Sequence, residues 1–147
     1  MTYEIIIIGI GVLIGLSLFK KTNPIFIKGI LVGLVVTFVL TFFGQQLLTD
    51  ISFFSFGILT LIFTVYSGMN KKWLNLIVGL FAFVSFFFIL MNYPFANELK
   101  LLMIIPIFCY LLIFRNWKKY NNELSILTIL VAYELTEFLR LAEQWIN

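Results

Sequence analysis

Three ionisable side chains lie close together near the end of an otherwise apolar chain: Glu134, Glu137 and Arg140. In a helix, residues three apart are neighbours, so Glu137 and Arg140 can pair directly. Glu134 lies to one side of that pair and has no obvious partner in its own helix. Because an unpaired carboxyl away from water is costly to ionise, Glu134 can pick up and release protons. These residues form the candidate ion-, proton- or partner-binding site.

Tyr133 and Gln144 extend the polar stripe that contains Glu137 and Arg140, because the four residues follow a 4-3-4 spacing along one helix face. The opposite face is apolar and consists of Leu135, Phe138, Leu139, Ala142, Trp145 and Ile146. The outer half of this helix is therefore amphipathic. Its polar face must meet protein, water or a partner instead of lipid.

A second polar stripe could face the first. Thr37, Thr41 and Gln45 recur every fourth residue in an earlier apolar segment, which places them on one helix face. We expect Thr41 and Gln45 to lie at depths that overlap residues 137–144. The sequence therefore predicts a polar cavity, open to the outside, between the second and the last segments.

The composition indicates that lipid surrounds the chain. Hydrophobic residues make up 62% of the 147 residues and charged residues 12%, whereas a soluble domain has about 45–50% apolar and about 25% charged residues. Such a chain cannot cover itself with polar surface. Several near-continuous apolar runs favour an all-α integral membrane protein over one buried core.

Six apolar segments approach the roughly 20 residues that cross a bilayer. They are residues 3–19, 25–46, 51–67, 73–93, 98–114 and 123–146. We therefore predict a six-helix transmembrane bundle that forms a single domain over residues 1–147. Pro106 lies inside the fifth segment and predicts a kink there.

Basic residues fall in alternate connections between these segments. The eight on one side are Lys20, Lys21, Lys28, Lys71, Lys72, Arg115, Lys118 and Lys119. The positive-inside rule then places both termini outside a multi-pass protein of the cell (plasma or inner) membrane. In an alternative interpretation, residues 133–146 lie flat on the membrane surface, which leaves five spans and an interfacial C-terminal helix.

Glycine pairs at a spacing of four residues mark two faces for close helix packing. Gly11 and Gly15 lie in the first segment, and Gly29 and Gly33 in the second. Such faces usually serve packing within the bundle, although they could also supply contacts between copies of the chain.

Several kinds of chemistry lack their residues in this sequence. Histidine is absent and Cys109 is the one cysteine, so no metal site built from His and Cys, no Ser-His-Asp triad and no haem histidine is possible. The basic residues are scattered in short clusters, which does not suit nucleic-acid binding. We expect no enzyme, no catalytic residues, no metal and no cofactor. A lipid-modifying enzyme ranks last, because no nucleophile accompanies the two acids.

Two functions fit these features. The first is a small ion- or proton-coupled transport or channel module, because ionisable residues inside a membrane are functional by default. The alternative is a non-catalytic membrane subunit that docks a larger complex through its charged last helix. The expected partners are the lipid bilayer and either further copies of this chain or other membrane subunits.

Overall fold

The computed structural model describes residues 2–93 and 100–146, and every regular element in these ranges is helical. The long helices are α1 (Thr2–Ser17), α2 (Ile25–Leu40), α3 (Gln46–Met69), α4 (Trp73–Leu90), α6 (Ile104–Arg115) and α8 (Leu124–Ile146). The short helical turns are η1 (Phe19–Lys21), η2 (Thr41–Phe43) and α7 (Trp117–Tyr120). The expected all-helical fold is therefore confirmed for this part of the chain.

Three helical stretches in the described ranges are long and apolar enough to cross a membrane: Ile25–Phe43, Gln46–Met69 and Trp73–Leu90. The apolar helices α1 and α6 are shorter. The outward-facing side chains of the bundle include large hydrophobic residues such as Leu13 of α1, Ile25 of α2 and Leu111 of α6. A surface of this kind is stable in lipid and not in water, so the chain has the character of a membrane protein.

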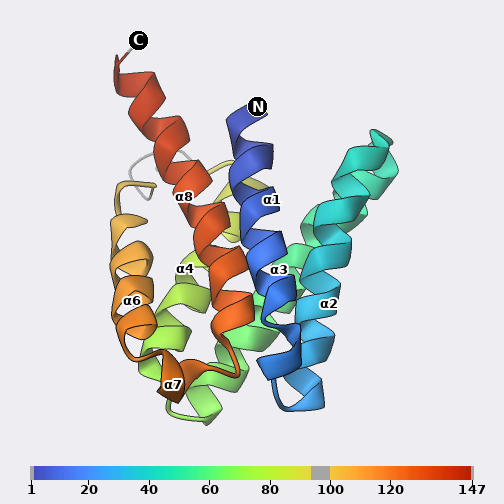
Figure 1. Cartoon of the computed structure of the whole chain (residues 1–147). Helices are drawn as coiled ribbons and strands as arrows, with labels where there is room; N and C mark the ends of the chain where they lie inside the picture. Colours follow the sequence, from blue (N-terminus) through green and yellow to red (C-terminus); the bar gives the residue numbers. More distant parts are fainter. Residues whose placement is uncertain (1, 94–99, 147) are drawn as a thin grey trace.

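The helices run alternately up and down, so the connections collect at two ends (Figure 1). The ends of α1 and α8 nearest the chain termini lie at the same end of the bundle as the turn between α2 and α3. The turns that carry the paired lysines, at η1, between α3 and α4, and at α7, lie at the opposite end. We call the latter the basic end of the bundle.

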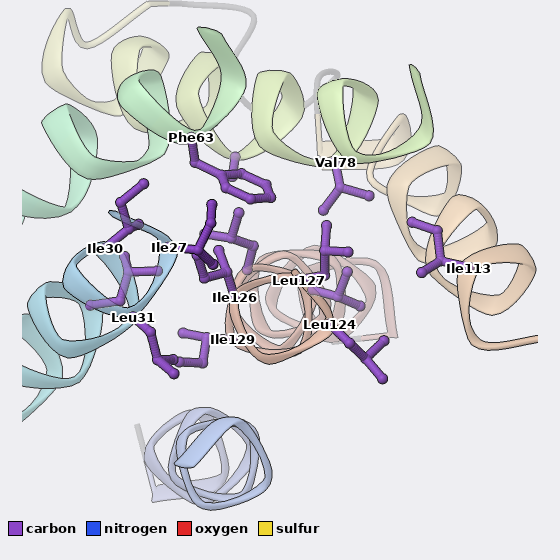
Figure 2. Close-up of a cluster of buried hydrophobic side chains, with 14 of the residues drawn as sticks. Ile27, Ile30, Leu31, Phe63, Val78, Ile113, Leu124, Ile126, Leu127 and Ile129 are labelled. Atoms are coloured by element: carbon purple, nitrogen blue, oxygen red, sulfur yellow. The ribbon is translucent and has the colours of Figure 1, made fainter. Parts of the chain in front are cut away.

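Helix α8 lies in the middle of the bundle (Figure 2), where it packs against α1, α2, α4 and α6. Every residue from 124 to 132 is buried, although this stretch has no polar face. The apolar side chains on all sides of the helix are matched by neighbours on all sides, as expected for a helix that is hydrophobic all round. The core is built around this helix.

The interfacial alternative for residues 133–146 does not fit this arrangement. Helix α8 continues without interruption from Leu124 to Ile146. The side chains of Glu134, Glu137 and Leu141 are all buried inside the bundle, whereas an interfacial helix would leave the two acids in water. With 23 residues, α8 is about 35 Å long.

The boundary between the second and third helices lies earlier in the chain than the sequence predicts. Helix α2 ends at Leu40, and η2 and Gly44 turn the chain before α3 begins at Gln46. Gly44 has φ of 64°, a left-handed conformation that glycine adopts without steric cost. The segment predicted to extend to Gln46 therefore stops being helical after Phe43, and Gln46 instead begins α3.

The predicted kink at Pro106 takes the form of a break. Residues 102–103 form a turn and α6 begins at Ile104, so Pro106 lies in the first helical turn. Proline has no N–H and its ring clashes with the carbonyl four residues earlier. The helix therefore restarts at the proline. The predicted start of this segment at Glu98 lies outside the described residues.

Three of the four predicted packing glycines lie against a neighbouring helix. A Cβ added at Gly11 would lie 2.5 Å from the Cβ of Ala132, and one at Gly15 would lie 2.9 Å from the Ser125 carbonyl oxygen, so both face α8. Gly33 faces Leu59 of α3 in the same way, at 2.8 Å. Gly29 has open space around it, so it does not serve packing within the chain.

Candidate functional site

Glu137 on α8 is at the centre of a buried group of charges. Its Oε2 atom lies 3.2 Å from Nζ of Lys100, which precedes α6. Its Oε1 atom lies 3.3 Å from a guanidinium nitrogen of Arg140, one turn further along α8. The predicted pair between Glu137 and Arg140 is therefore present, and it has a third member. The Glu137 side chain is only 5% exposed, so two cations offset the cost of burying its charge.

Arg140 connects this group to the first helix. Its guanidinium lies 2.7 Å from the Glu4 carboxylate, and its Nε donates a hydrogen bond to the same oxygen at 2.8 Å. One turn higher, the Tyr3 hydroxyl donates a hydrogen bond to Glu143 at 2.8 Å. These polar contacts connect α1 to α8 above the close approach at Gly11 and Gly15. We call Lys100, Glu137, Arg140 and Glu4 the charge network.

The charge network holds two cations and two anions, so its formal charges cancel. Arg140 is bonded to an acid on either side, and Glu137 to a base on either side. Such alternation lets each charge stabilise its neighbours in a poorly solvated environment. Lys100 and Arg140 are therefore already paired, and neither is free to neutralise a further acid nearby.

Glu134 is that further acid, one turn deeper along α8. Its side chain is 0% exposed. Both of its carboxylate oxygens lack a hydrogen-bond partner among the described residues. A buried polar group without a partner costs free energy, and an ionised one costs much more. The expected lack of a partner is thus present in the structure, at the most enclosed acid of the last helix.

Glu134 points toward α4 and α6. Leu127 lies two turns below it on the same face of α8, and Figure 2 shows Leu127 beside Val78 of α4 and near Ile113 of α6. Cys109 lies one turn above Ile113 on α6. Below Glu134 this interface is mainly apolar, although the Tyr110 hydroxyl of α6 lies 2.7 Å from the Thr128 hydroxyl of α8. The carboxyl therefore lies where the dry lower core meets the charge network.

The side chains of Tyr133 and Thr41 lie on the wall of a cavity. Both line a cavity of about 210 Å³ between α1, α2, α3 and α8. The Tyr133 ring packs on Phe56, with their centroids 4.7 Å apart. Glu134, Glu137 and Arg140 do not line this cavity. The sequence predicted a polar cavity between the second and last helices. The cavity found there has mainly apolar walls, and the charged residues of α8 do not line it.

Gln45 and Gln144 are both exposed and lie outside the charge network. Gln45 precedes α3 with an extended backbone, so it does not continue the stripe of Thr37 and Thr41. The stripe is broken because α2 ends at Leu40. Gln144 lies in the last turns of α8, which project beyond the other helices in Figure 1.

Sequence reasoning did not identify Lys100 and Glu4 as site residues. Each is a charged residue at the edge of an apolar segment. Charges in that position normally lie at the membrane surface, so neither was expected to reach the buried acids. A useful signal was available: Lys100 is the one basic residue between segments that falls on the side opposite the other loop cations. That side is also the side of Glu137 and Arg140.

A second buried ion pair lies at the basic end of the bundle. Nζ of Lys72, between α3 and α4, lies 2.5 Å from Oε1 of Glu123, and Glu123 is almost fully buried. Buried side-chain atoms of Ser67, Asn75 and Glu123 lack hydrogen-bond partners in the described ranges. Ser67 also accepts a backbone hydrogen bond from Lys72 through its carbonyl. Polar groups therefore enclose both ends of the dry stretch of α8.

The described residues contain no group of three or more His, Cys, Asp or Glu side chains that could hold a metal ion. The chain has no significant match among known protein families, characterised proteins or solved structures. Its function must therefore be argued from the site.

Proposed function

We propose that the chain is a multi-pass protein of the cell membrane that acts as a proton-coupled transport module, with Glu134 as its proton-binding group. Six helices cross the bilayer in this proposal, with both termini outside and the basic end in the cytoplasm. The positive-inside rule supports this orientation, because the lysine-bearing turns lie together at one end of the bundle.

One observation carries the proposal: the Glu134 carboxyl is fully buried and has no partner among the described residues. It lies one helical turn from Glu137, whose charge is already balanced by Lys100 and Arg140. A carboxyl in this position is stable when it holds a proton. Losing the proton would place an extra negative charge beside the charge network, and that charge would compete with Glu137 for the two cations.

The packing favours a carrier over an open channel. Residues 124–132 of α8 are all buried below Glu134, a dry stretch of about 14 Å. Between α8 and α6 this stretch carries one hydrogen-bonded pair of hydroxyls, Thr128 and Tyr110. The apolar side chains around that pair interrupt any continuous polar path for ions. Transport would require a second arrangement of the helices that exposes Glu134 to the basic end, as in alternating access.

Proton flux into vesicles tests the proposal. Purified protein is reconstituted into liposomes that contain a pH-sensitive dye, and a membrane potential is imposed. We expect flux with the wild type and its loss in Glu134→Gln, because the amide cannot exchange a proton. Glu143→Gln is the matched control, since it removes an exposed acid of the same helix. Equal flux in wild type and Glu134→Gln would refute the proposal.

A non-catalytic subunit that docks a larger membrane complex is the second candidate, and one observation favours it. The last turns of α8 project beyond the rest of the bundle (Figure 1), and Gln144 is exposed there. The charges of Glu137 and Arg140 are engaged within the chain, so a partner would bind this projecting end. Co-purification of a heteromeric partner in mild detergent, lost when residues 144–147 are removed, would support this function.

Contacts between copies of the chain are also part of the proposal. Gly11, Gly15 and Gly33 are covered by other helices of the same chain, which leaves Gly29 among the predicted glycines. Gly29 lies on an exposed stripe of α2 with Ile25, Val32 and Val36. If a homo-oligomer uses a small-residue face, we propose that α2 supplies it.

A further inference from the structure

The cavity lined by Tyr133 has walls from four helices. Its apolar lining residues are Ile8, Leu34, Phe38, Phe53, Phe56 and Ile129. Leu34 and Ile129 are buried at its floor, whereas Thr41 and Thr49 are exposed at its rim. Figure 1 shows the ends of α2 and α3 next to η2 diverging from α1 and α8. The cavity therefore opens toward the surface on the side of the turn between α2 and α3.

The Ser and Thr hydroxyls in the cavity wall are already engaged. Thr37 donates to the Leu34 carbonyl at 2.7 Å, and Thr41 donates to the Phe38 carbonyl at 2.7 Å. The other two, Ser52 and Thr49, donate to the carbonyls of Thr37 and Gln45. Because these hydroxyl hydrogens point to backbone oxygens, they are not available to donate to a ligand. The cavity therefore selects an apolar occupant.

The volume limits the size of that occupant. The cavity measures about 210 Å³, which exceeds an apolar cavity of roughly 150 Å³ that accepts benzene. It is smaller than the range of about 300–1,000 Å³ for sites that bind drug-sized molecules. A single flexible alkyl chain fits these limits, whereas a sterol or a large aromatic ring system does not.

The surroundings of the opening indicate where the alkyl chain comes from. Two of the cavity walls, α2 and α3, are helices apolar and long enough to cross a membrane. Val39, Phe42 and Leu47, which flank the opening in sequence, are exposed apolar side chains. In a bilayer these residues face phospholipid, and the abundant alkyl chains there belong to that lipid.

We propose that this cavity binds the end of one acyl chain of a membrane phospholipid, which enters from the side between the diverging ends of α2 and α8. This site is separate from the proton-binding group, because the buried acids do not line the cavity. The two sites meet in sequence at Tyr133, which forms part of the cavity wall, and Glu134. This proposal does not depend on proton binding by Glu134. Failure to bind lipid would not bear on proton flux, and failure to carry protons would not bear on lipid binding.

Photo-crosslinking tests the site. The full chain is reconstituted in phosphatidylcholine vesicles in which some lipid carries a diazirine near the end of one acyl chain. Mild detergent removes loosely associated lipid before irradiation, and mass spectrometry locates the modified residues. We expect modification at Phe53 or Phe56, and at least fivefold less in Ile8→Trp, which fills the cavity. Ile6→Trp is the matched control, because Ile6 is 56% exposed and adds the same bulk to the outside of α1.

Two further variants keep the test decisive if Ile8→Trp does not fold. Thr49→Phe fills the cavity from its rim and should also reduce the modification, whereas Phe38→Ala enlarges the cavity and should preserve it. Equal modification in the filled variants would overturn the proposal. So would modification of Phe53 and Phe56 no stronger than that of Leu80, a surface residue of α4. Labelling of the cavity by a water-soluble diazirine in place of the lipid would show a hydrated cavity and would also overturn it.

Discussion

Glu134 and Glu137 are neighbours on one helix, yet the structure gives them opposite roles in stability. Glu137 holds Lys100 and Arg140 together, and the Lys100 side chain is only 11% exposed. Removing one partner of a buried ion pair costs about 3–5 kcal/mol, because the other charge stays buried. Arg140 is 43% exposed and water screens it, so we expect a loss of about 3 kcal/mol in Glu137→Gln.

Glu134→Gln serves as the comparison in the same unfolding experiment. The Glu134 carboxyl makes no hydrogen bond among the described residues, so an amide of similar shape removes no contact. We expect its free energy of unfolding to stay within about 1 kcal/mol of the wild type. Denaturant-induced unfolding in detergent micelles, followed by circular dichroism, measures both variants. A larger loss for Glu134→Gln than for Glu137→Gln would contradict the assignment of the charges.

The contact between Lys100 and Glu137 can be isolated by a double-mutant cycle. We expect Lys100→Met and Glu137→Gln to be strongly non-additive, with a coupling of about 1–3 kcal/mol, because each substitution removes the same ion pair. The unfolding free energies of the wild type, both single variants and the double variant give this value. Additive effects would mean that Lys100 does not stabilise Glu137.

At the scale of single residues, spacing along one helix predicts some of the site residues, whereas the others can be found only from the tertiary structure. The Glu137–Arg140 pair and the unpartnered Glu134 follow from positions along one helix. Lys100 and Glu4 are distant in sequence, so their roles depend on how α1 and α6 pack against α8. The spacing of Thr41 and Gln45 predicts one polar stripe near the acids. The turn at Gly44 instead separates Gln45 from α2, and Thr41 lines the cavity.

At the scale of elements, the close approach of α1 and α8 gives a sharp prediction. In Gly11→Ala the new Cβ would lie 2.5 Å from that of Ala132, so the helices must separate. Overpacking of this kind costs about 1–3 kcal/mol. Gly29→Ala has open space and should be neutral or stabilising by up to about 1 kcal/mol, since alanine favours a helix. Thermal unfolding of both variants in micelles measures the difference, and equal midpoints would contradict the packing.

The helices themselves were largely predictable, whereas their ends were not. Long apolar runs identify α2, α3 and α4 directly. The end of α2 and the start of α6 depend on Gly44 and Pro106, whose effect on the chain is local. An apolar run such as Phe42-Phe43 looks the same in a helix and in a turn that faces lipid. Hydrophobicity therefore locates membrane helices better than it locates their boundaries.

At the scale of the whole molecule, the proposed orientation can be tested by cysteine labelling. In a Cys109→Ala background, Gln45→Cys lies in the turn between α2 and α3, and Lys119→Cys lies in α7. Both positions are exposed, and they lie at opposite ends of the bundle. We expect a membrane-impermeant maleimide to label Gln45→Cys in intact cells and Lys119→Cys only after lysis. Labelling of both in intact cells would contradict the six-span arrangement.

The central position of α8 explains why a chain of this size can bury ionisable groups at all. Five other long helices surround or support it, so its acids meet protein instead of hydrocarbon. The sequence indicated this through a helix that is apolar on all sides and then abruptly charged. Which helices surround it, and which of their charges reach it, could not be derived from hydropathy.

The protonation state of Glu134 is the most direct test of this account. Infrared spectroscopy of the protein in lipid vesicles at neutral pH detects the C=O stretch of a protonated carboxylic acid separately from that of a carboxylate. We predict a protonated-acid band in the wild type that disappears in Glu134→Gln and persists in Glu143→Gln. A spectrum without this band, or one that Glu134→Gln leaves unchanged, would contradict the claim that the buried carboxyl holds a proton.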